Sequence, residues 1–417
     1  MLALLLVSGL ALSPPDTVVL DVQSALGRGL DASPILAAAL HRADAVAELA
    51  AQARAWPNPH LGLAAENVGQ QSAFTGLTGW DGLEGQAVLT APLPLGWERS
   101  GSIRVARAED RIAQAGGEVA ELQVRAALIA QLGAFLRQQA LVQTAREELG
   151  TLTRIAEALS LQASAGRAPT GDAARAQLAR VMAVTGLARR EAELARNSAE
   201  LARQLGLSPD TPLRIETEPC DRSTAPPTGM PGVEAPELRI AEARVDAARG
   251  YVVTARGLAL PDLEPQLGLR RTGGQTGFYL GLSTQLPLFD LGARRLSAAR
   301  AQEQAALADQ EEQASRWVAG HAAALNTLAV LQAAGESFGQ QWRLDLEQTV
   351  TAAEARYELG EGTLVELLDS RRARLQALDD YHAWLAEWWG ARTDLARLEG
   401  RPLDASLLCT DPLREIP

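Results

Sequence analysis

The chain has 417 residues, a formal net charge of −12 and no lysine, so all of its 39 basic residues are arginines. An acidic chain without a basic stripe argues against nucleic acid as a partner, because neutralising phosphates dominates that kind of affinity. Its 4 His, 3 Met and 2 Cys are scattered without ligand spacing, and no phosphate loop, Ser-His-Asp set or pair of catalytic carboxylates is present. We therefore expect no metal centre, no cofactor and no enzymatic activity.

The N-terminus predicts export. Residues 2–12 are apolar, and Ala11 and Ser13 are placed as in a small-x-small cleavage site, so residues 1–13 are predicted to be a signal peptide, although a basic segment before the run is missing. No later stretch approaches the ~20 apolar residues of a spanning helix. If the protein crosses a membrane, it is therefore expected to do so with strands.

The first half of the chain predicts helix, strand pair, long helix and return helix. In chain order the elements are a helix over 32–56 ended by Pro57-Asn58-Pro59, strands over 60–67 and 85–95 around a polar loop, a helix over 98–162, a turn at 166–169 and a helix over 172–205. The second half gives strands over 263–272 and 276–288 around a Gly273-Gly274-Gln275 turn, an uninterrupted helix over 293–358, a turn at 360–362 and a helix over 364–399.

The second half repeats the first. Leu201, Ala202 and Arg203 recur 194 residues later as Leu395, Ala396 and Arg397, so helix lengths are copied almost residue for residue. From the N-terminus, the predicted organisation is a signal peptide over 1–13, a first repeat over 14–219, a linker over 220–233, a second repeat over 234–405 and a C-terminal tail over 406–417. Cys220 and Cys409 lie after corresponding helix ends, and either a disulfide in an oxidising compartment or two unpaired thiols fits that placement.

The helix lengths predict a barrel of helices. A helix of about 65 residues is roughly 100 Å long, and a return helix of about 35 residues stacked end to end on an opening helix of about 25 matches it. Four strands cannot close a barrel, and an open sheet in lipid would leave unpaired backbone groups at both edges. Membrane insertion therefore requires oligomerisation, with at least about eight strands in the closed barrel and twelve from three copies.

Several motifs resemble those of a known family. They are Pro57-Asn58-Pro59 with Glu66-Asn67, Pro92 to Gly96, Pro261-Asp262-Leu263, Leu286 to Asp290, and Tyr357-Glu358-Leu359-Gly360 followed by residues 364–369. The chain resembles the TolC-like outer-membrane factors of tripartite efflux pumps and type I secretion systems. Glu66-Asn67 and the run at 94–99 are similar to the heavy-metal efflux branch.

This resemblance implies a mainly α fold with a small transmembrane β part. Internally duplicated helical hairpins would form an α-barrel, and four strands per protomer would enter a trimeric 12-stranded barrel. The homotrimer would sit in outer-membrane lipid of a Gram-negative-type bacterium and extend into the periplasm, where an adaptor and an inner-membrane pump would dock. Its function would be a passive exit duct for small molecules or metal ions. A type I protein-secretion duct stays open, as does a periplasmic coiled-coil scaffold or adaptor outside the membrane.

The expected functional residues lie at the helix-hairpin tips. Glu366 and Asp369 share a helix face, and the resemblance implies that they line the entrance, where rings of like charge select and gate; a solvated helix start is the alternative. Asp172 is either a comparable gate residue or a helix cap. Gly362 stands where family members often carry an arginine that closes the tip, and Arg167 is the candidate substitute. The resemblance also places adaptor docking at Gly166, Tyr357, Gly360 and Gly362.

Overall fold

The computed structural model describes residues 17–66, 84–94, 97–216, 235–257, 262–272, 275–284, 289, 292–401 and 403. The chain forms two compact units: the first comprises residues 1–37, 120–234 and 317–417, and the second comprises residues 38–119 and 235–316. The predicted signal peptide, linker and C-terminal tail, together with Cys220 and Cys409, lie outside the described residues.

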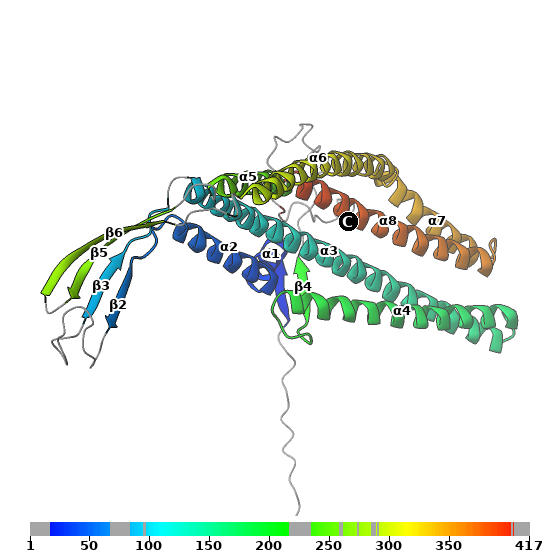
Figure 1. The fold of residues 1–417 in the computed structure, drawn as a ribbon. Helices are drawn as coiled ribbons and strands as arrows, with labels where there is room; N and C mark the ends of the chain where they lie inside the picture. Colours follow the sequence, from blue (N-terminus) through cyan, green and yellow to red (C-terminus); the bar gives the residue numbers. More distant parts are fainter. Residues whose placement is uncertain are drawn as a thin grey trace, which may run out of the picture. The chain divides into compact units, whose positions relative to one another are not determined.

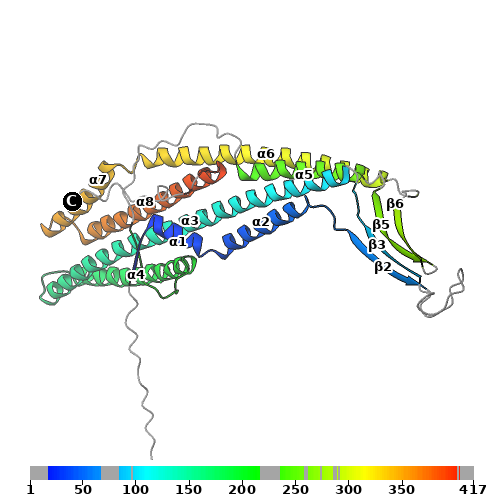
Figure 2. The ribbon, with the colours of Figure 1, turned by 90° about the vertical axis from the view of Figure 1, so that its left-hand side faces the viewer.

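The second unit contains a four-stranded antiparallel sheet. Its strands are β2 (His60–Glu66), β3 (Glu84–Thr90), β5 (Leu263–Thr272) and β6 (Gln275–Thr284), in the order β2-β3-β5-β6. The two predicted hairpins are thus confirmed, and β3 pairs with β5 to join them, with Leu89 opposite Leu267. Figures 1 and 2 show the four strands side by side in one curved sheet.

The two faces of this sheet differ in chemistry because side chains alternate along each strand. One face carries large exposed apolar side chains, and these are Leu61, Leu63, Leu89, Leu267, Leu269, Phe278, Leu280 and Leu282. The other face carries polar side chains joined by a series of hydrogen bonds. Tyr279 donates to Gln266 at 3.0 Å, Gln266 donates to Ser283 at 3.3 Å, and Ser283 donates to Glu264 at 3.0 Å. Phe278 is 87% exposed and Leu280 is 79% exposed, so the apolar face is uncovered within one chain.

The helices of the second unit pack closely through glycine. This unit contains most of α2 (Pro34–Gln52), the beginning of α3 (Trp97–Ser164), α5 (Pro236–Gly257) and the beginning of α6 (Ala293–Gly335). A Cβ at Gly101 of α3 would lie 2.9 Å from the carbonyl oxygen of Gly250 on α5, and closer still to Thr254. Asp246 of α5 is also contacted by Arg111 of α3, whose hydrogen bond is the main reason that the pKa of Asp246 is lowered.

The first unit contains elements that the sequence did not predict. The strands β1 (Val18–Asp21) and β4 (Leu213–Glu216) form a parallel pair, and α1 (Val22–Asp31) follows β1 with Asp21 as its N-cap. Their side chains join the main core of this unit. Its buried members include Val22, Ala25, Leu26, Leu128, Ile129, Leu132, Phe135, Leu201, Leu205, Ile215, Tyr381, Leu385, Trp389, Ala396 and Leu403.

Two helical hairpins and the C-terminal part of α6 make up the rest of the first unit (Figure 1). The first hairpin consists of α3 and α4 (Thr170–Gln204), and the second consists of α7 (Gln340–Glu358) and α8 (Leu364–Leu398). The continuous helix α3 confirms the predicted long rod, since 68 residues span about 100 Å. The predicted uninterrupted helix over 293–358 is wrong, because it is divided into α6, which ends at Gly335, and α7.

Aromatic packing accounts for this interruption. A Cβ at Gly335 would collide with the indole ring of Trp384 on α8, whose Nε1 donates to the carbonyl oxygen of Leu331 at 2.8 Å. Phe338, in the break, contacts Trp342, Tyr381 and Trp384 with ring centroids 5.2–5.4 Å apart. The chain therefore leaves helical geometry where the aromatic side chains of α7 and α8 meet.

One helix qualifies as a candidate membrane span by composition. Within the described residues, α3 contains an 18-residue stretch apolar enough to cross a membrane, which the sequence analysis did not anticipate. Leu128, Ile129, Leu132 and Phe135 of α3 belong to the core of the first unit. Core packing thus accounts for these four side chains, while 28% of the apolar stretch as a whole is buried.

Candidate functional site at the hairpin tips

Both hairpins turn through the same backbone motif. Gly166 has φ 71° and Gly360 has φ 74°, a left-handed conformation that glycine adopts without steric cost. The amide of Arg167 donates to the carbonyl of Gln162 at 2.8 Å, and that of Glu361 donates to Arg356 at 2.9 Å, as in a Schellman cap. Gly166 and Gly360 are 194 residues apart, as are Gly206 and Gly400, which close α4 and α8 in the same way. The helix ends therefore follow the sequence repeat.

Replacing Gly360 by alanine should destabilise the second tip by roughly 1–2 kcal/mol, the cost of a left-handed L-residue. No atom lies within 4 Å of the added Cβ, so the effect comes from the backbone alone. The measurement is the urea midpoint of the purified protein by circular dichroism. Gly171→Ala is the matched control, because Gly171 has equal space on α4 without the positive φ, and an equal loss in both variants would contradict the prediction.

Glu366 is both a helix cap and half of an ion pair. Its backbone amide donates to the Thr363 hydroxyl oxygen at 3.2 Å, and its carboxylate accepts from the Thr363 amide at 3.2 Å, which is a complete capping box. Arg356, in the last turn of α7, lies 3.8 Å from the same carboxylate. Sequence reasoning missed Arg356, although its position just before Tyr357 at the tip was a usable signal.

Among the other charged residues of the tips, Asp369 and Arg167 are exposed, whereas Asp172 is half-buried. Asp369 pairs with Arg372 at 3.3 Å on α8, and Asp172 pairs with Arg175 at 3.3 Å on α4. Asp172 lies in the first turn of α4, whose N-cap is Pro169, so it is not the cap residue. Arg167 is exposed, and within the described part of the chain it has no carboxylate partner.

Tyr357 brings the two tips together. It packs against a cluster drawn from both hairpins, whose buried members are Leu152, Ala156, Leu159, Ala176, Ala179, Leu364 and Leu368. Burial raises the pKa of the Tyr357 phenol, and the nearby negative charge of Asp172 raises it further. The predicted residues Tyr357 and Asp172 are therefore neighbours. Gly362 is crowded, since a Cβ there would lie 3.2 Å from Cβ of Arg356 and 3.3 Å from the Glu366 carboxylate.

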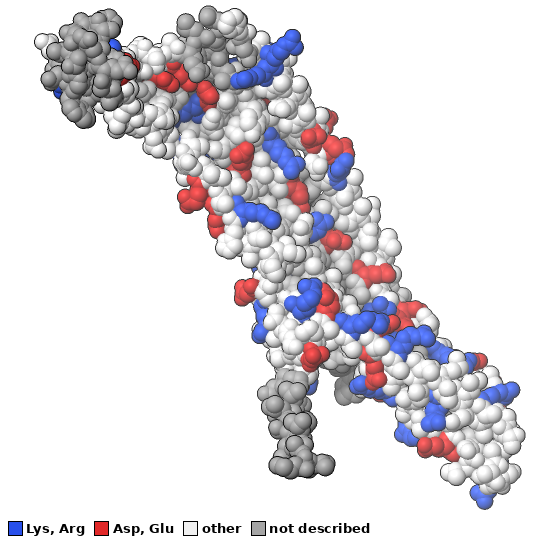
Figure 3. Space-filling model, turned by 60° about the horizontal axis from the view of Figure 1, so that its bottom comes forward, with Lys and Arg blue, Asp and Glu red and all other residues white. Residues whose placement is uncertain are grey.

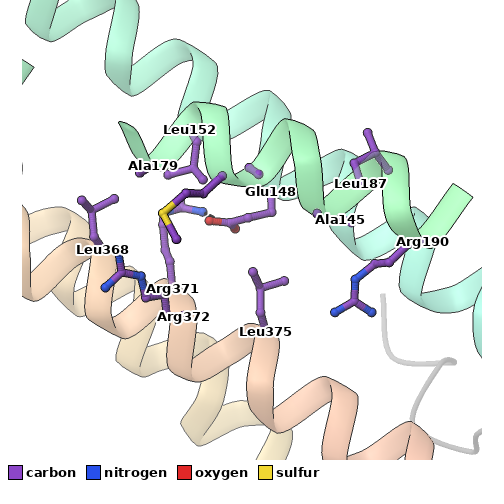
Figure 4. Close-up of a pocket in the computed structure, with 13 residues that line it drawn as sticks. Ala145, Glu148, Leu152, Ala179, Leu187, Arg190, Leu368, Arg371, Arg372 and Leu375 are labelled. Carbon is purple, nitrogen blue, oxygen red and sulfur yellow. Dashed lines mark hydrogen bonds and ion pairs between the residues drawn. The ribbon is translucent and has the colours of Figure 1, made fainter. Parts of the chain in front are cut away.

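A cleft of about 210 Å³ lies farther along the two hairpins (Figure 4). Glu148 of α3, Arg190 of α4 and Arg371 of α8 line it with mostly apolar neighbours. Arg371 contacts Glu148 at 3.0 Å, and Arg190 contacts Asp379 of α8 through two hydrogen bonds of 3.3 and 2.9 Å. Sequence reasoning did not find these pairs, because their members are 223 and 189 residues apart.

The surface carries charges of both signs. On the face drawn in Figure 3, arginines and acidic residues are interspersed rather than gathered into one patch. Among the described residues, no three His, Cys, Asp or Glu side chains come together as metal ligands. The chemistry available at the tips is therefore electrostatic, with carboxylates that can attract cations.

Comparisons with known proteins agree with this architecture. The outer membrane efflux protein family profile matches residues 233–401. The chain is 30% identical to Protein CyaE of Bordetella pertussis, over 96% of this chain and 89% of the relative. It is 26% identical to the cobalt-zinc-cadmium resistance protein CzcC of Cupriavidus metallidurans, over 92% of this chain and 90% of the relative. Its fold is similar to that of the outer-membrane channel OprN, with a TM-score of 0.76 and 22% identity. The similarity covers 91% of this chain and 90% of OprN.

The tips, the helical hairpins and the four-stranded sheet are thus parts of one recognised architecture. The resemblance to outer-membrane factors is confirmed over nearly the whole chain. The chain belongs to the outer membrane efflux protein family, and it is an outer-membrane channel that serves as the exit duct of an efflux system.

Proposed function

We propose that three copies of the chain assemble into one duct whose barrel has twelve strands. The observation that carries this proposal is the four-stranded sheet with one exposed apolar face. Its outer strands β2 and β6 have one neighbour each within the described sheet. A sheet with one apolar and one polar face is unstable in lipid while its edge strands are unpaired, so it must close into a barrel. Strand directions alternate across the sheet, so β6 of one copy can pair antiparallel with β2 of the next.

In this assembly the apolar face of the sheet meets lipid and the polar face lines the lumen, as in other membrane barrels. Glu264, Gln266, Tyr279 and Ser283 then face the passage, and their mutual hydrogen bonds keep them satisfied there. The duct is passive, and an inner-membrane pump supplies the energy through a periplasmic adaptor. The adaptor docks on the hairpin tips, where Gly166, Tyr357, Gly360 and Gly362 form the surface.

Glu366 and Asp369 of the three copies form the charged entrance in this proposal, with Asp172 and Arg167 beside them on the first tip. Both carboxylates are more than half exposed, so they are available to ions. We propose divalent metal cations as the cargo class. This rests on the acidic tip and on the similarity to a cobalt-zinc-cadmium resistance protein.

Neutralising the entrance in the double variant Glu366→Gln, Asp369→Asn should weaken the block of single-channel current by Co²⁺ or Zn²⁺ about tenfold or more. A divalent cation about 8 Å from one carboxylate gains roughly 1 kcal/mol in water. Six carboxylates together should still strengthen binding of the divalent cation about tenfold after salt screening. Glutamine at the Glu366 position can keep the capping box, so helix α8 should still form. The measurement is current in planar bilayers with increasing divalent cation.

Glu48→Gln is the control, because Glu48 is an exposed carboxylate on α2 and belongs to neither tip. It should leave the block unchanged. An unchanged block in the double variant would remove Glu366 and Asp369 from the entrance, while a wild-type protein that conducts no current would contradict the duct itself.

A further inference from the structure

The four strands of the sheet meet the helices of the second unit at one end of the sheet (Figures 1 and 2). The strand register places His60 opposite Thr90 and Thr90 opposite Gln266, so the junctions between helices and strands lie together. Strands β5 and β6 have 10 residues each, which matches the 9–11 residues of a tilted transmembrane strand. In the proposed duct the helices extend into the periplasm, so these junctions lie at the periplasmic surface of the membrane.

Three of the junctions carry an exposed aromatic side chain. Trp56 lies between α2 and β2 and is 62% exposed, Trp97 begins α3 and is 53% exposed, and Phe289 lies between β6 and α6 and is fully exposed. Aromatic rings are enriched at membrane–water interfaces, where tryptophan combines an apolar ring with one polar N–H group. The three rings are therefore placed where the acyl chains of a lipid meet its headgroup.

Each of the four junctions also carries an arginine, and we call these four residues the junction arginines. They are Arg54 after α2, Arg99 at the beginning of α3, Arg256 in the last turn of α5 and Arg294 at the beginning of α6. Within the described part of the chain, none of them contacts a carboxylate. Arg99 instead lies over the ring of Trp56, 4.6 Å from its centroid, and donates a hydrogen bond to the carbonyl oxygen of Arg54. The junctions thus hold positive charge that no acidic side chain described here neutralises.

Two of the junction arginines occupy equivalent places in the repeat. Arg54 lies 5 residues before Pro59, and Arg256 lies 5 residues before Pro261. A second equivalent pair, Arg42 and Arg244, lies 12 residues earlier on the same helices, about 18 Å from the junctions. Arg42 and Arg244 are also exposed and contact no described carboxylate. They differ from the junction arginines in their distance from the sheet.

We propose that the junction arginines bind the phosphate groups of anionic phospholipids in the periplasmic leaflet of the outer membrane. A guanidinium group can donate two parallel hydrogen bonds to one phosphate, and the neighbouring aromatic rings contact the upper part of the acyl chains. Lipids with a net negative charge bind better than zwitterionic lipids, whose own ammonium group opposes the guanidinium charge. This inference rests on the proposed function, because it requires the apolar face of the sheet to meet lipid.

The test is tryptophan fluorescence of the full-length protein in phosphatidylcholine vesicles that contain increasing fractions of phosphatidylglycerol, with either lipid brominated. Bromine quenches tryptophans that contact lipid, so the two series give the relative affinity for the two lipids beside Trp56 and Trp97. Wild type should prefer phosphatidylglycerol about fivefold or more, because each basic residue near an anionic surface contributes a factor of about five. The double variant Arg54→Gln, Arg256→Gln should lose about fivefold of this preference.

Arg42→Gln, Arg244→Gln is the matched control, since it removes the same charge from the same helices at more than a Debye length from the junctions, and it should keep the preference. Equal affinity of wild type for the two lipids overturns the proposal, as does an equal loss in the control. If the double variant does not insert, Arg54→Gln decides against Arg42→Gln. Wild-type fluorescence that neither brominated lipid quenches would instead refute the membrane-embedded sheet of the proposed duct, so the two failures are distinct.

Discussion

Replacing Leu267 by arginine should prevent assembly in the outer membrane, whereas replacing its neighbour Gln266 by arginine should not. Leu267 lies on the apolar face of β5 and is 56% exposed, while Gln266 lies on the polar face. An arginine on the lipid face of a barrel costs about 2–4 kcal/mol at the bilayer midplane. Three copies would carry that cost together, which is comparable to the whole stability of many domains.

The measurement is the amount of each variant in heat-resistant oligomers from outer-membrane fractions. Gln266→Arg loses the hydrogen bonds to Tyr279 and Ser283, each of which contributes about 1 kcal/mol, so a small decrease is expected for it. Equal assembly of Leu267→Arg and wild type would mean that the apolar face does not contact lipid.

Replacing Gly101 by valine should disrupt the packing of α3 against α5 and destabilise the protein. The added carbon atoms would meet the hydroxyl oxygen and the backbone nitrogen of Thr254 and the carbonyl oxygen of Gly250. Overpacking of a core typically costs 1–3 kcal/mol, and we expect about 3 kcal/mol here because neither backbone can yield without moving its helix. The measurement is the urea midpoint of unfolding, followed by circular dichroism.

Gly116→Ala is the matched control for that experiment. Gly116 lies on the same helix, and no atom is within 4 Å of an added Cβ. Alanine in a helix interior is roughly 0.5–1 kcal/mol more favourable than glycine, so this variant should be slightly more stable than wild type. A Gly101→Val protein as stable as Gly116→Ala would show that α3 and α5 do not approach closely.

Elements with local signals were predicted well from the sequence. The strand pairs and the tip turns are marked by proline, glycine and alternation, and the structure has β2, β3, β5 and β6 at those places. The repeat made the prediction stronger, because Gly166 and Gly360 mark corresponding turns. The predicted helix over 98–162 rested on a long stretch without proline, and the structure has α3 at that place.

Elements that depend on distant contacts were not predicted. The break between α6 and α7 has no proline, and it arises because Trp384 occupies the space beside Gly335. The strands β1 and β4 have four residues each, and parallel pairing across nearly two hundred residues leaves no local pattern. The predicted uninterrupted helix over 293–358 rested on the absence of proline and on helix-forming residues, and neither signal reports aromatic packing.

The candidate site was predicted in part. The family motif identified Glu366, Asp369 and Tyr357, and the structure places Tyr357 beside Asp172. The roles of these residues in the entrance stay predictions. Arg356 was missed although it lies just before Tyr357. Arg371 was missed because one of several arginines in α8 carries no signal until the opposing carboxylate is known.

Electron microscopy of the detergent-extracted protein from outer-membrane fractions tests the proposed duct most directly. A three-fold particle, with a short barrel formed by the sheets of three copies and a helical tunnel attached to it, is the predicted result. A monomer or dimer recovered from the soluble fraction would contradict it, because the sheet of one chain has open edges and cannot close a barrel alone.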